Sequence, residues 1–186
     1  GKHVAAASAL RLKSMALWKD RCFGHASILH SVNSHKQEID YSIPRLTFER
    51  LFKTSIPSRR EWHTTRPWRR GELNFYTDGS KLDDKVGYGV FSKELGLELS
   101  VRLPDYCSVY QAEVLAIKEV ATYLNMHAVT KTTINIFSDS QAAIKSMNAA
   151  LLRSKVAQEC RAALNDISDV FKVCLLYTSD AADEGL

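Results

Sequence analysis

Three carboxylates have the clearest potential for chemistry in this 186-residue chain: Asp78, Glu113 and Asp139. Asp78 and Asp139 each follow a short run of apolar and aromatic residues, and Glu113 lies between them in a stretch with helical spacing. Carboxylates brought together repel one another unless a cation neutralises them. An all-oxygen ligand set suits Mg²⁺ or Mn²⁺ and does not suit zinc. The residue types therefore predict a site for divalent cations and, through them, for phosphate.

Taken singly, each carboxylate has an ordinary explanation. Asp78 stands in an Asp-Gly pair, which is a strong hairpin signal, and Asp139 could cap a helix. Glu113 lies four residues from both Val109 and Ile117, on an apolar stripe, but it could reach solvent from the edge of that stripe. As a set they are more informative, since the ends of neighbouring parallel strands and an adjoining helix meet at one edge of a sheet.

Five strands and three helices are expected after residue 71. The first three strands are joined by short turns, which favours an antiparallel meander, and helices between the later strands imply parallel crossovers. The expected fold is therefore α/β, with a mixed five-stranded sheet of three antiparallel strands followed by two parallel ones. The expected strands are Leu73–Thr77, Val86–Ser92, Leu97–Leu103, Thr133–Phe137 and Phe171–Tyr177, with helices over 108–124, 141–147 and 151–170.

Two capping boxes predict where helices begin. Ser108-x-x-Gln111 precedes the helix that carries Glu113, and Ser138-x-x-Gln141 precedes the next helix. Asn125 is a plausible end for the first of them.

Charge is divided unevenly along the chain. Residues 1–71 hold 14 Lys and Arg against 5 Asp and Glu, whereas residues 72–186 hold 11 against 16. The basic part indicates a polyanionic partner such as nucleic acid. Residues 1–55 are predicted to be a mostly helical basic segment, with helices over Val4–Trp18 and around Arg45–Lys53.

Residues 56–71 carry two Pro, two Trp and five Arg, a composition typical of a linker. Interleaved Arg and Trp could follow a nucleic-acid backbone and stack on bases. The alternative is a basic tether whose Trp side chains lie on the neighbouring domain, and we favour the tether.

The cysteines and the hydropathy favour an intracellular protein, nuclear or cytoplasmic and not secreted. Cys22, Cys107, Cys160 and Cys174 show no metal-ligand spacing and do not resemble a disulfide framework. No apolar run approaches the roughly 20 residues that span a bilayer, so no membrane association is expected.

Three segments resemble the first three motifs of cellular and retroelement ribonuclease H, in order and spacing. They are Tyr76-Thr-Asp-Gly-Ser80, Gln111-Ala-Glu-Val-Leu-Ala-Ile117 and Ser138-Asp-Ser-Gln-Ala-Ala143, and the resemblance covers roughly residues 73–173. Residues 85–92 look most like the ribonuclease H domain at the end of the polyprotein of insect-type non-LTR retrotransposons. Residues 8–18 and 24–29 look like the segment that joins the reverse transcriptase to that domain. The resemblance thus implies a ribonuclease H domain over residues 72–173, with a reverse transcriptase in the same parent polyprotein.

The resemblance implies hydrolysis of the RNA strand of RNA–DNA hybrids, on a three-layer fold with helices on the faces of the sheet. The three carboxylates would hold two Mg²⁺ ions, for which Mn²⁺ can substitute. One ion would lower the pKa of the attacking water and the other would stabilise the leaving 3′ oxygen. Gln141 and the backbone near Gly79 and Ser80 are candidates for contacts with the minor groove and its 2′-hydroxyls.

Two departures from the family pattern are expected to matter. Many members place Asn residues just before the helix Glu, where this chain has Val109 and Tyr110. The family's final loop with a His and its C-terminal helix with a fourth metal-binding Asp are not found after the last strand. Residues 174–186 look like one reading frame of a sequencing adapter, so we expect the natural coding sequence to stop near Val173. On this basis the chain is expected to be inactive or weakly active.

Two other functions remain open for this sequence. One is a non-catalytic nucleic-acid-binding or tethering module with the same fold. The other keeps the fold with another substrate, as in integrases, but the Asp-Gly-Ser and Asp-Ser-Gln contexts favour ribonuclease H.

Overall fold

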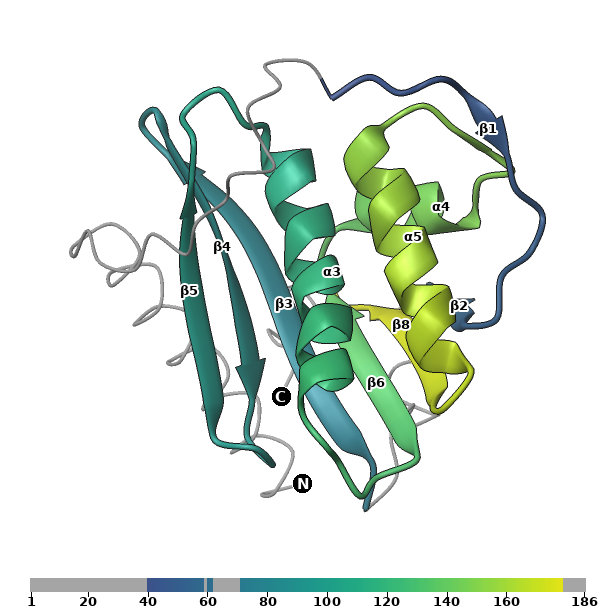
Figure 1. Cartoon of the computed structure of the whole chain (residues 1–186). Coiled ribbons are helices and arrows are strands. Elements are labelled where there is room, and N and C mark those ends of the chain that lie inside the picture. The colour runs from purple at the N-terminus through teal and green to yellow at the C-terminus, as the bar shows by residue number, and fades with distance from the viewer. Residues whose placement is uncertain (1–39, 59, 62–70, 179–186) are drawn as a thin grey trace.

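The computed structural model describes residues 40–58, 60–61 and 71–178, and a mixed sheet of six strands is its main feature (Figure 1). The strand order is β2-β8-β6-β3-β4-β5, with β3, β4 and β5 antiparallel and β2, β8, β6 and β3 parallel. All five expected strands are present, and the sixth, β2, adds an edge that the sequence did not predict. The strands are β2 (Lys53–Ser55), β3 (Leu73–Leu82), β4 (Lys85–Ser92), β5 (Leu97–Leu103), β6 (Thr133–Ser138) and β8 (Lys172–Tyr177).

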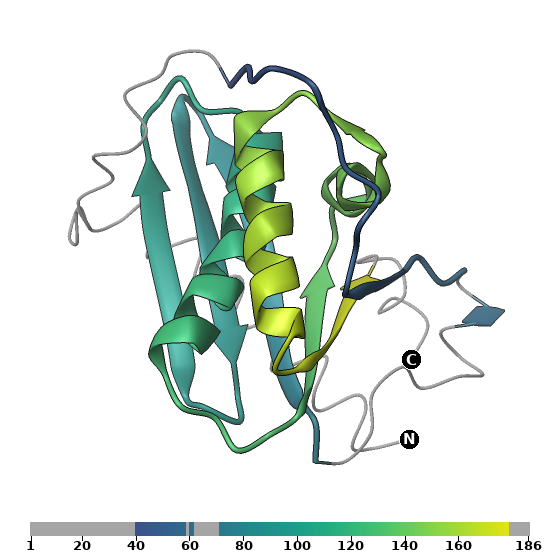
Figure 2. The same cartoon turned by 45° about the vertical axis from the view of Figure 1, so that its right-hand side comes forward.

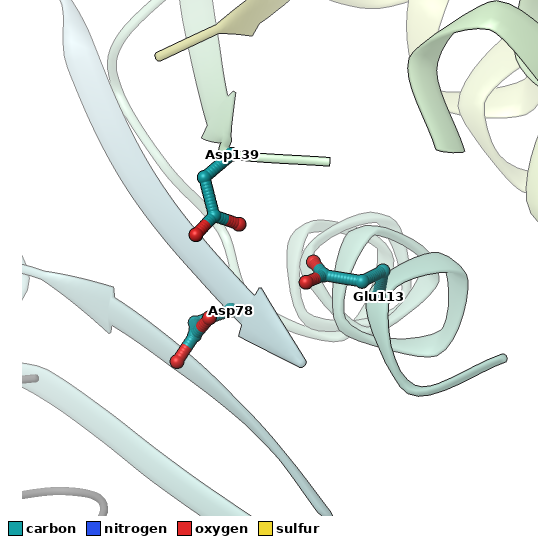
Figure 3. A group of neighbouring side chains, drawn as sticks. All are labelled: Asp78, Glu113 and Asp139. Carbon is teal, nitrogen blue, oxygen red and sulfur yellow. The ribbon is translucent and has the colours of Figure 1, made fainter. Parts of the chain in front are cut away.

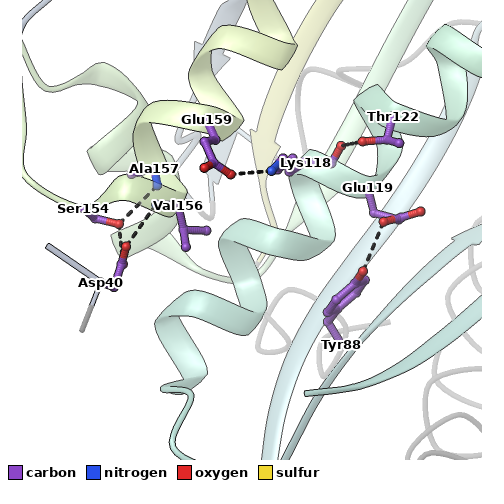
Figure 4. Close-up of polar contacts among 9 residues, drawn as sticks. All are labelled: Asp40, Tyr88, Lys118, Glu119, Thr122, Ser154, Val156, Ala157 and Glu159. Carbon is purple, nitrogen blue, oxygen red and sulfur yellow. Dashed lines mark hydrogen bonds and ion pairs between the residues drawn. The ribbon is translucent and has the colours of Figure 1, made fainter. Parts of the chain in front are cut away.

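Two helices form a layer over one face of the sheet. Figures 1 and 2 show α3 (Val109–Met126) and α5 (Lys155–Ser168) side by side, with the short α4 (Gln141–Asn148) beyond the end of β6. The Nζ atom of Lys118 on α3 lies 2.5 Å from Oε2 of Glu159 on α5 (Figure 4). A second helical layer, which the resemblance implies, is not seen within residues 71–178.

The helix α3 follows its predicted boundaries closely because its first turn is capped as expected. The Oγ atom of Ser108 accepts from the Gln111 backbone N–H at 3.1 Å, and the Gln111 side chain accepts from the Ser108 N–H at 2.7 Å. One face of α3 is fully buried against β3 and β4, which places Glu113 in the second turn of a helix lying on the sheet.

The first strand continues beyond its predicted end. Asp78 was expected at the end of a strand, but β3 runs on to Leu82 because residues 79–81 keep pairing with β4. The hairpin turn is formed instead by Asp83 and Asp84, and Asp83 has a positive φ of 53°. Asp78 therefore lies inside β3, paired with Gly89 of β4, one residue beyond the last pair with β6.

The second predicted capping box is wrong. The α4 helix is capped by Ser140, whose Oγ accepts from the Ala143 N–H at 3.2 Å. Ser138 is still the last residue of β6, and its Oγ accepts from the Ser140 N–H, so it is engaged before the helix begins. The next helix also begins later than expected, since Leu151–Leu152 forms the strand β7.

The helix expected around Arg45–Lys53 is wrong. The segment is extended, with β1 (Arg45–Leu46) pairing with β7 and β2 pairing with β8 (Figure 1). Tertiary contacts override the local preference: the Arg161 guanidinium donates to the carbonyl oxygens of Thr47 and Glu49, and Phe52 is buried in the core. This strap (residues 40–55) is part of the folded unit.

Several expectations lie outside the described residues. These are the helix over Val4–Trp18, most of the linker, and residues 179–186 of the tail. Cys107, Cys160 and Cys174 are free, as the spacing indicated. Among the described residues, no helix has the length and apolar character needed to cross a bilayer.

A buried carboxylate cluster as candidate metal centre

The three predicted carboxylates are brought together at one end of the parallel strands. Asp78, Glu113 and Asp139 each offer an oxygen, and these oxygens all lie within 4.8 Å of one another. Figure 3 shows the side chains pointing toward a common centre from β3, from α3 and from the residue after β6. Asp78 and Glu113 are only 6% and 5% exposed. The sequence expectation that these residues converge is confirmed.

The pairing of β3 with β6 sets the positions of the two aspartates. The last aligned pair of these parallel strands is Thr77 with Ser138, so the next residue of each chain is an aspartate. The buried Thr77 hydroxyl donates to the carbonyl oxygen of Phe137 at 3.1 Å, joining the strands one step before the site. This threonine was not singled out from the sequence, in which nothing distinguishes it from other strand residues.

Glu113 reaches the site because Gly79 lets α3 approach the sheet. A Cβ atom built on Gly79 would lie 2.5 Å from the Glu113 backbone nitrogen and 2.9 Å from its Cγ. Such distances are too short for any side chain to be tolerated without movement. The Gly79 N–H also hydrogen-bonds the Glu113 carboxylate. A glycine inside a strand signals this kind of close approach, so the role could have been recognised once Asp-Gly was assigned to a strand.

Burial and neighbouring charge control the protonation of Glu113. Desolvation, followed by the negative charges of Asp139 and Asp78, raises the pKa of Glu113 to about 9. A hydrogen bond with Asp139 raises this pKa further, and the bond from Gly79 lowers it in part. At neutral pH the cluster thus keeps a proton on Glu113, since three adjacent carboxylates do not ionise together in a buried site.

These residues fit a divalent cation. The Oε2 atom of Glu113 is buried and has no hydrogen-bond partner within the described part of the chain. The donor set consists of carboxylate oxygens only, as Mg²⁺ and Mn²⁺ prefer. A bound cation would also replace the proton on Glu113, because a nearby positive charge favours the ionised carboxylate.

The predicted substrate contacts lie around this cluster. Ser80 is half-buried two residues after Asp78 on β3, and Gln141 is exposed at the start of α4. Gly79 is buried at the point on β3 where α3 comes closest to the strand. Contact of these three residues with nucleic acid stays a prediction.

Comparisons with known proteins leave the family unassigned. No family model matches the chain, and no curated protein does. Among solved structures the chain is similar to RNase H1 from the halophilic archaeon Halobacterium salinarum NRC-1, with 19% sequence identity and a TM-score of 0.45. The match covers 61% of this chain and 90% of the archaeal chain. The function proposed below rests on the carboxylate geometry and on the motifs.

Proposed function

We propose that the carboxylate cluster binds divalent cations and that the chain hydrolyses the RNA strand of RNA–DNA hybrids. The observation that carries the proposal is the convergence of Asp78, Glu113 and Asp139, with ligand oxygens within 4.8 Å of one another. The three motifs that contain these residues resemble those of ribonuclease H and support the substrate class. The cofactor we propose is Mg²⁺, as two ions, with Mn²⁺ as a substitute.

Each residue has a defined part in this proposal. Asp78 on β3 and Asp139 directly after β6 would hold the cations, and Glu113 would complete the ligand set from α3 in its ionised form. When bound, the two cations would lower the pKa of the attacking water and stabilise the leaving 3′ oxygen. Gly79 holds the Glu113 carboxylate through its N–H, while Ser80 and Gln141 lie where the minor groove of a hybrid could be contacted.

The wider context follows from the resemblance. We propose that residues 72–173 are the ribonuclease H part of a retrotransposon polyprotein, joined through residues 1–55 and the linker 56–71 to a reverse transcriptase. The basic residues before position 72 would add nucleic-acid affinity. Such a protein would act in the nucleus or cytoplasm.

A cleavage assay tests the function. The purified chain, in large excess over a hybrid labelled on each strand in turn, is expected to cut the RNA strand slowly in Mg²⁺. Cutting should stop in EDTA and in the Asp139→Asn variant, whereas the exposed Asp166→Asn variant should match wild type. Cleavage that continues in D139N would show a contaminating nuclease and would remove support for the site.

The same assay separates hydrolysis from the alternative of a binding or tethering module. A module that only binds should hold the hybrid with equal affinity in Mg²⁺ and in EDTA and release no RNA fragments. That result would replace the hydrolase proposal for this chain. Hybrid affinity that rises with Mg²⁺ and falls in D139N supports the cation site as the point of contact with phosphate.

A further inference from the structure

Exposed polar side chains on α4 lead away from the carboxylate cluster. Gln141, Lys145 and Asn148 are exposed and lie four and three residues apart, which places them on one face of the helix. The helix begins two residues after Asp139. Its rise puts Lys145 about 6 Å and Asn148 about 10 Å beyond Gln141. These side chains therefore start beside the candidate cation site and run outward from it.

The strap continues this line beyond the end of α4. The Thr54 hydroxyl donates to Oδ1 of Asn148 at 2.7 Å and accepts from the Arg50 guanidinium at 3.2 Å. Figures 1 and 2 show the strap passing beside α4 before it reaches β2. The polar line thus consists of Gln141, Lys145, Asn148, Thr54 and Arg50, and it contains two cations and no carboxylate.

The strap is fixed at the point where it carries Arg50. Arg161 donates to the carbonyl oxygen of Glu49, the residue before Arg50. It also donates to the carbonyl oxygen of Ala149, the first residue after α4. The guanidinium carbon of Arg50 lies 6.0 Å from the centroid of the buried Phe52 ring. Arg50 is therefore held beside the end of α4.

The two cations of the polar line are not neutralised. Neither Lys145 nor Arg50 forms an ion pair with a carboxylate in the part of the chain that the structure describes. Within the same residues Arg50 uses one of its five N–H donors, in the bond to Thr54. Desolvation and then the charge of Arg50 lower the pKa of Arg161, so two like charges lie close together. An anion at this place would relieve their repulsion.

The position and the charge of the polar line favour a phosphodiester backbone as its ligand. With cations bound, the carboxylate cluster would hold one phosphate, and the next phosphates of the same strand would lie further out. Lysine binds phosphate as a point charge, and the planar arginine fork can bind two of its oxygens. Cations spaced along a line suit such a repeating anion better than a single small one.

We propose that the polar line binds the nucleic-acid backbone beyond the phosphate held at the carboxylate cluster, with Lys145 and Arg50 as the phosphate-binding residues. The inference rests on the proposed function for the phosphate at the cluster. It makes the strap part of the substrate surface in addition to its place in the fold. Phosphate contacts of this kind supply affinity and orientation and carry no sequence information.

Binding of a fluorescently labelled RNA–DNA hybrid to the whole 186-residue chain tests the proposal. In EDTA, where no cutting is expected, the R50Q/K145Q variant should bind on the order of tenfold more weakly than wild type at low salt. The slope of the affinity against salt, on logarithmic axes, should fall by about 1 for each cation removed. The loss should be equal for hybrids of different sequence.

Two further variants show whether charge at these positions is responsible. Lys93→Gln is the matched control, because Lys93 is exposed in the turn after β4, at the other end of the sheet from Asp78. It should bind the hybrid as wild type does, and equal affinity of R50Q/K145Q and K93Q would overturn the proposal. Arg50→Lys keeps the charge and should retain most of the affinity. A loss in R50K as large as in R50Q would overturn the role of Arg50 as a phosphate-binding cation.

Mn²⁺ binding by the same variants separates this proposal from the proposed function. R50Q/K145Q should bind Mn²⁺ as wild type does, because neither residue belongs to the carboxylate cluster. If wild type binds Mn²⁺ and cuts the hybrid but R50Q/K145Q holds the hybrid as tightly as K93Q, the polar line is overturned and the proposed function stands. Weaker hybrid binding by R50Q/K145Q in a chain that takes up no Mn²⁺ would support the polar line and overturn the cation site.

Discussion

A Cβ atom on Gly79 would lie 2.5 Å from the backbone nitrogen of Glu113. The helix α3 therefore rests on the backbone of β3 at the residue next to Asp78, and this contact sets how far the Glu113 carboxylate reaches. Because Gly79 has no Cβ, α3 can approach β3 closely enough for Glu113 to join the two aspartates.

The Gly79→Ala substitution should push α3 away from β3. Overpacking of this kind costs about 2 kcal/mol, to be measured by urea unfolding. Displacing Glu113 should also weaken Mg²⁺ binding about tenfold, the usual effect of disturbing residues that support a metal ligand.

Gly96→Ala is the matched control for this substitution. Nothing lies within 4 Å of a Cβ at Gly96, whose φ of +60° still imposes a backbone cost. It should lower stability by about 1 kcal/mol and leave Mg²⁺ affinity unchanged. If G79A binds Mg²⁺ as tightly as G96A does, the contact does not position Glu113.

Glu113 should make the stability of the cation-free protein depend on pH. Its pKa is 4.5 when unperturbed and about 9 in the folded chain. Between these values the folded state keeps a proton that the unfolded state has released, so stability is greatest below the lower pKa and is lost as pH rises toward the upper one.

The Glu113→Gln variant should lack this loss. In EDTA, urea unfolding between pH 4.5 and about pH 9 should show that the free energy of unfolding of wild type falls with pH relative to that of E113Q. Mg²⁺ should restore wild-type stability at the alkaline end and leave E113Q nearly unaffected, since ligand binding to the folded state stabilises it. Parallel pH profiles for the two proteins would mean that Glu113 is ionised without a cation.

Sequence patterns predicted the elements that obey local rules. The spacing of apolar residues and the Ser108 capping box placed α3 almost to the residue, and short segments bounded by turns identified five of the six strands of the sheet. The grouping of Asp78, Glu113 and Asp139 could also be predicted, because strand ends and an adjoining helix converge in a parallel arrangement.

Features that depend on distant partners could not be predicted. The segment around residues 45–53 has helical spacing, yet it is extended. The reason is Arg161, which donates to the carbonyl oxygens of Thr47 and Glu49 although it lies 114 and 112 residues from them in the sequence. Asp-Gly is locally a turn signal, but pairing with β4 keeps Gly79 within a strand. Ser138 and Ser140 compete for one helix start: the capping-box pattern favoured Ser138, but Ser138 is the last residue of β6 and Ser140 caps the helix.

Arg161 should contribute strongly to the stability of the strap. Its side chain, 4% exposed, donates to the carbonyl oxygens of Thr47, Glu49 and Ala149. Arg161→Ala should cost about 3 kcal/mol in urea unfolding, because three part-buried carbonyl groups lose charge-assisted hydrogen bonds. The exposed Arg153→Ala should stay within about 0.5 kcal/mol of wild type. Equal effects of the two substitutions would remove the assigned role.

Ser140 should be the residue that caps α4. Ser140→Ala should lower stability by about 1 kcal/mol. It should also speed amide exchange of Ala143, because the Ser140 hydroxyl accepts a hydrogen bond from the Ala143 N–H. Ser138→Ala should leave the exchange of Ala143 near the wild-type rate, since the Ser138 hydroxyl accepts from Ser140 instead. Faster exchange of Ala143 in S138A than in S140A would restore the capping box expected from the sequence.

Titration with Mn²⁺, followed by the loss of the free-ion electron paramagnetic resonance signal, tests the carboxylate cluster most directly. Wild type is predicted to bind Mn²⁺, and Asp139→Asn to bind it at least about tenfold more weakly, because it removes one of three converging ligands. Asp166→Asn, which changes an exposed carboxylate, should bind as wild type does. Wild type that takes up no Mn²⁺, or D139N that binds as tightly as wild type, would contradict the assignment of Asp78, Glu113 and Asp139 as a cation site.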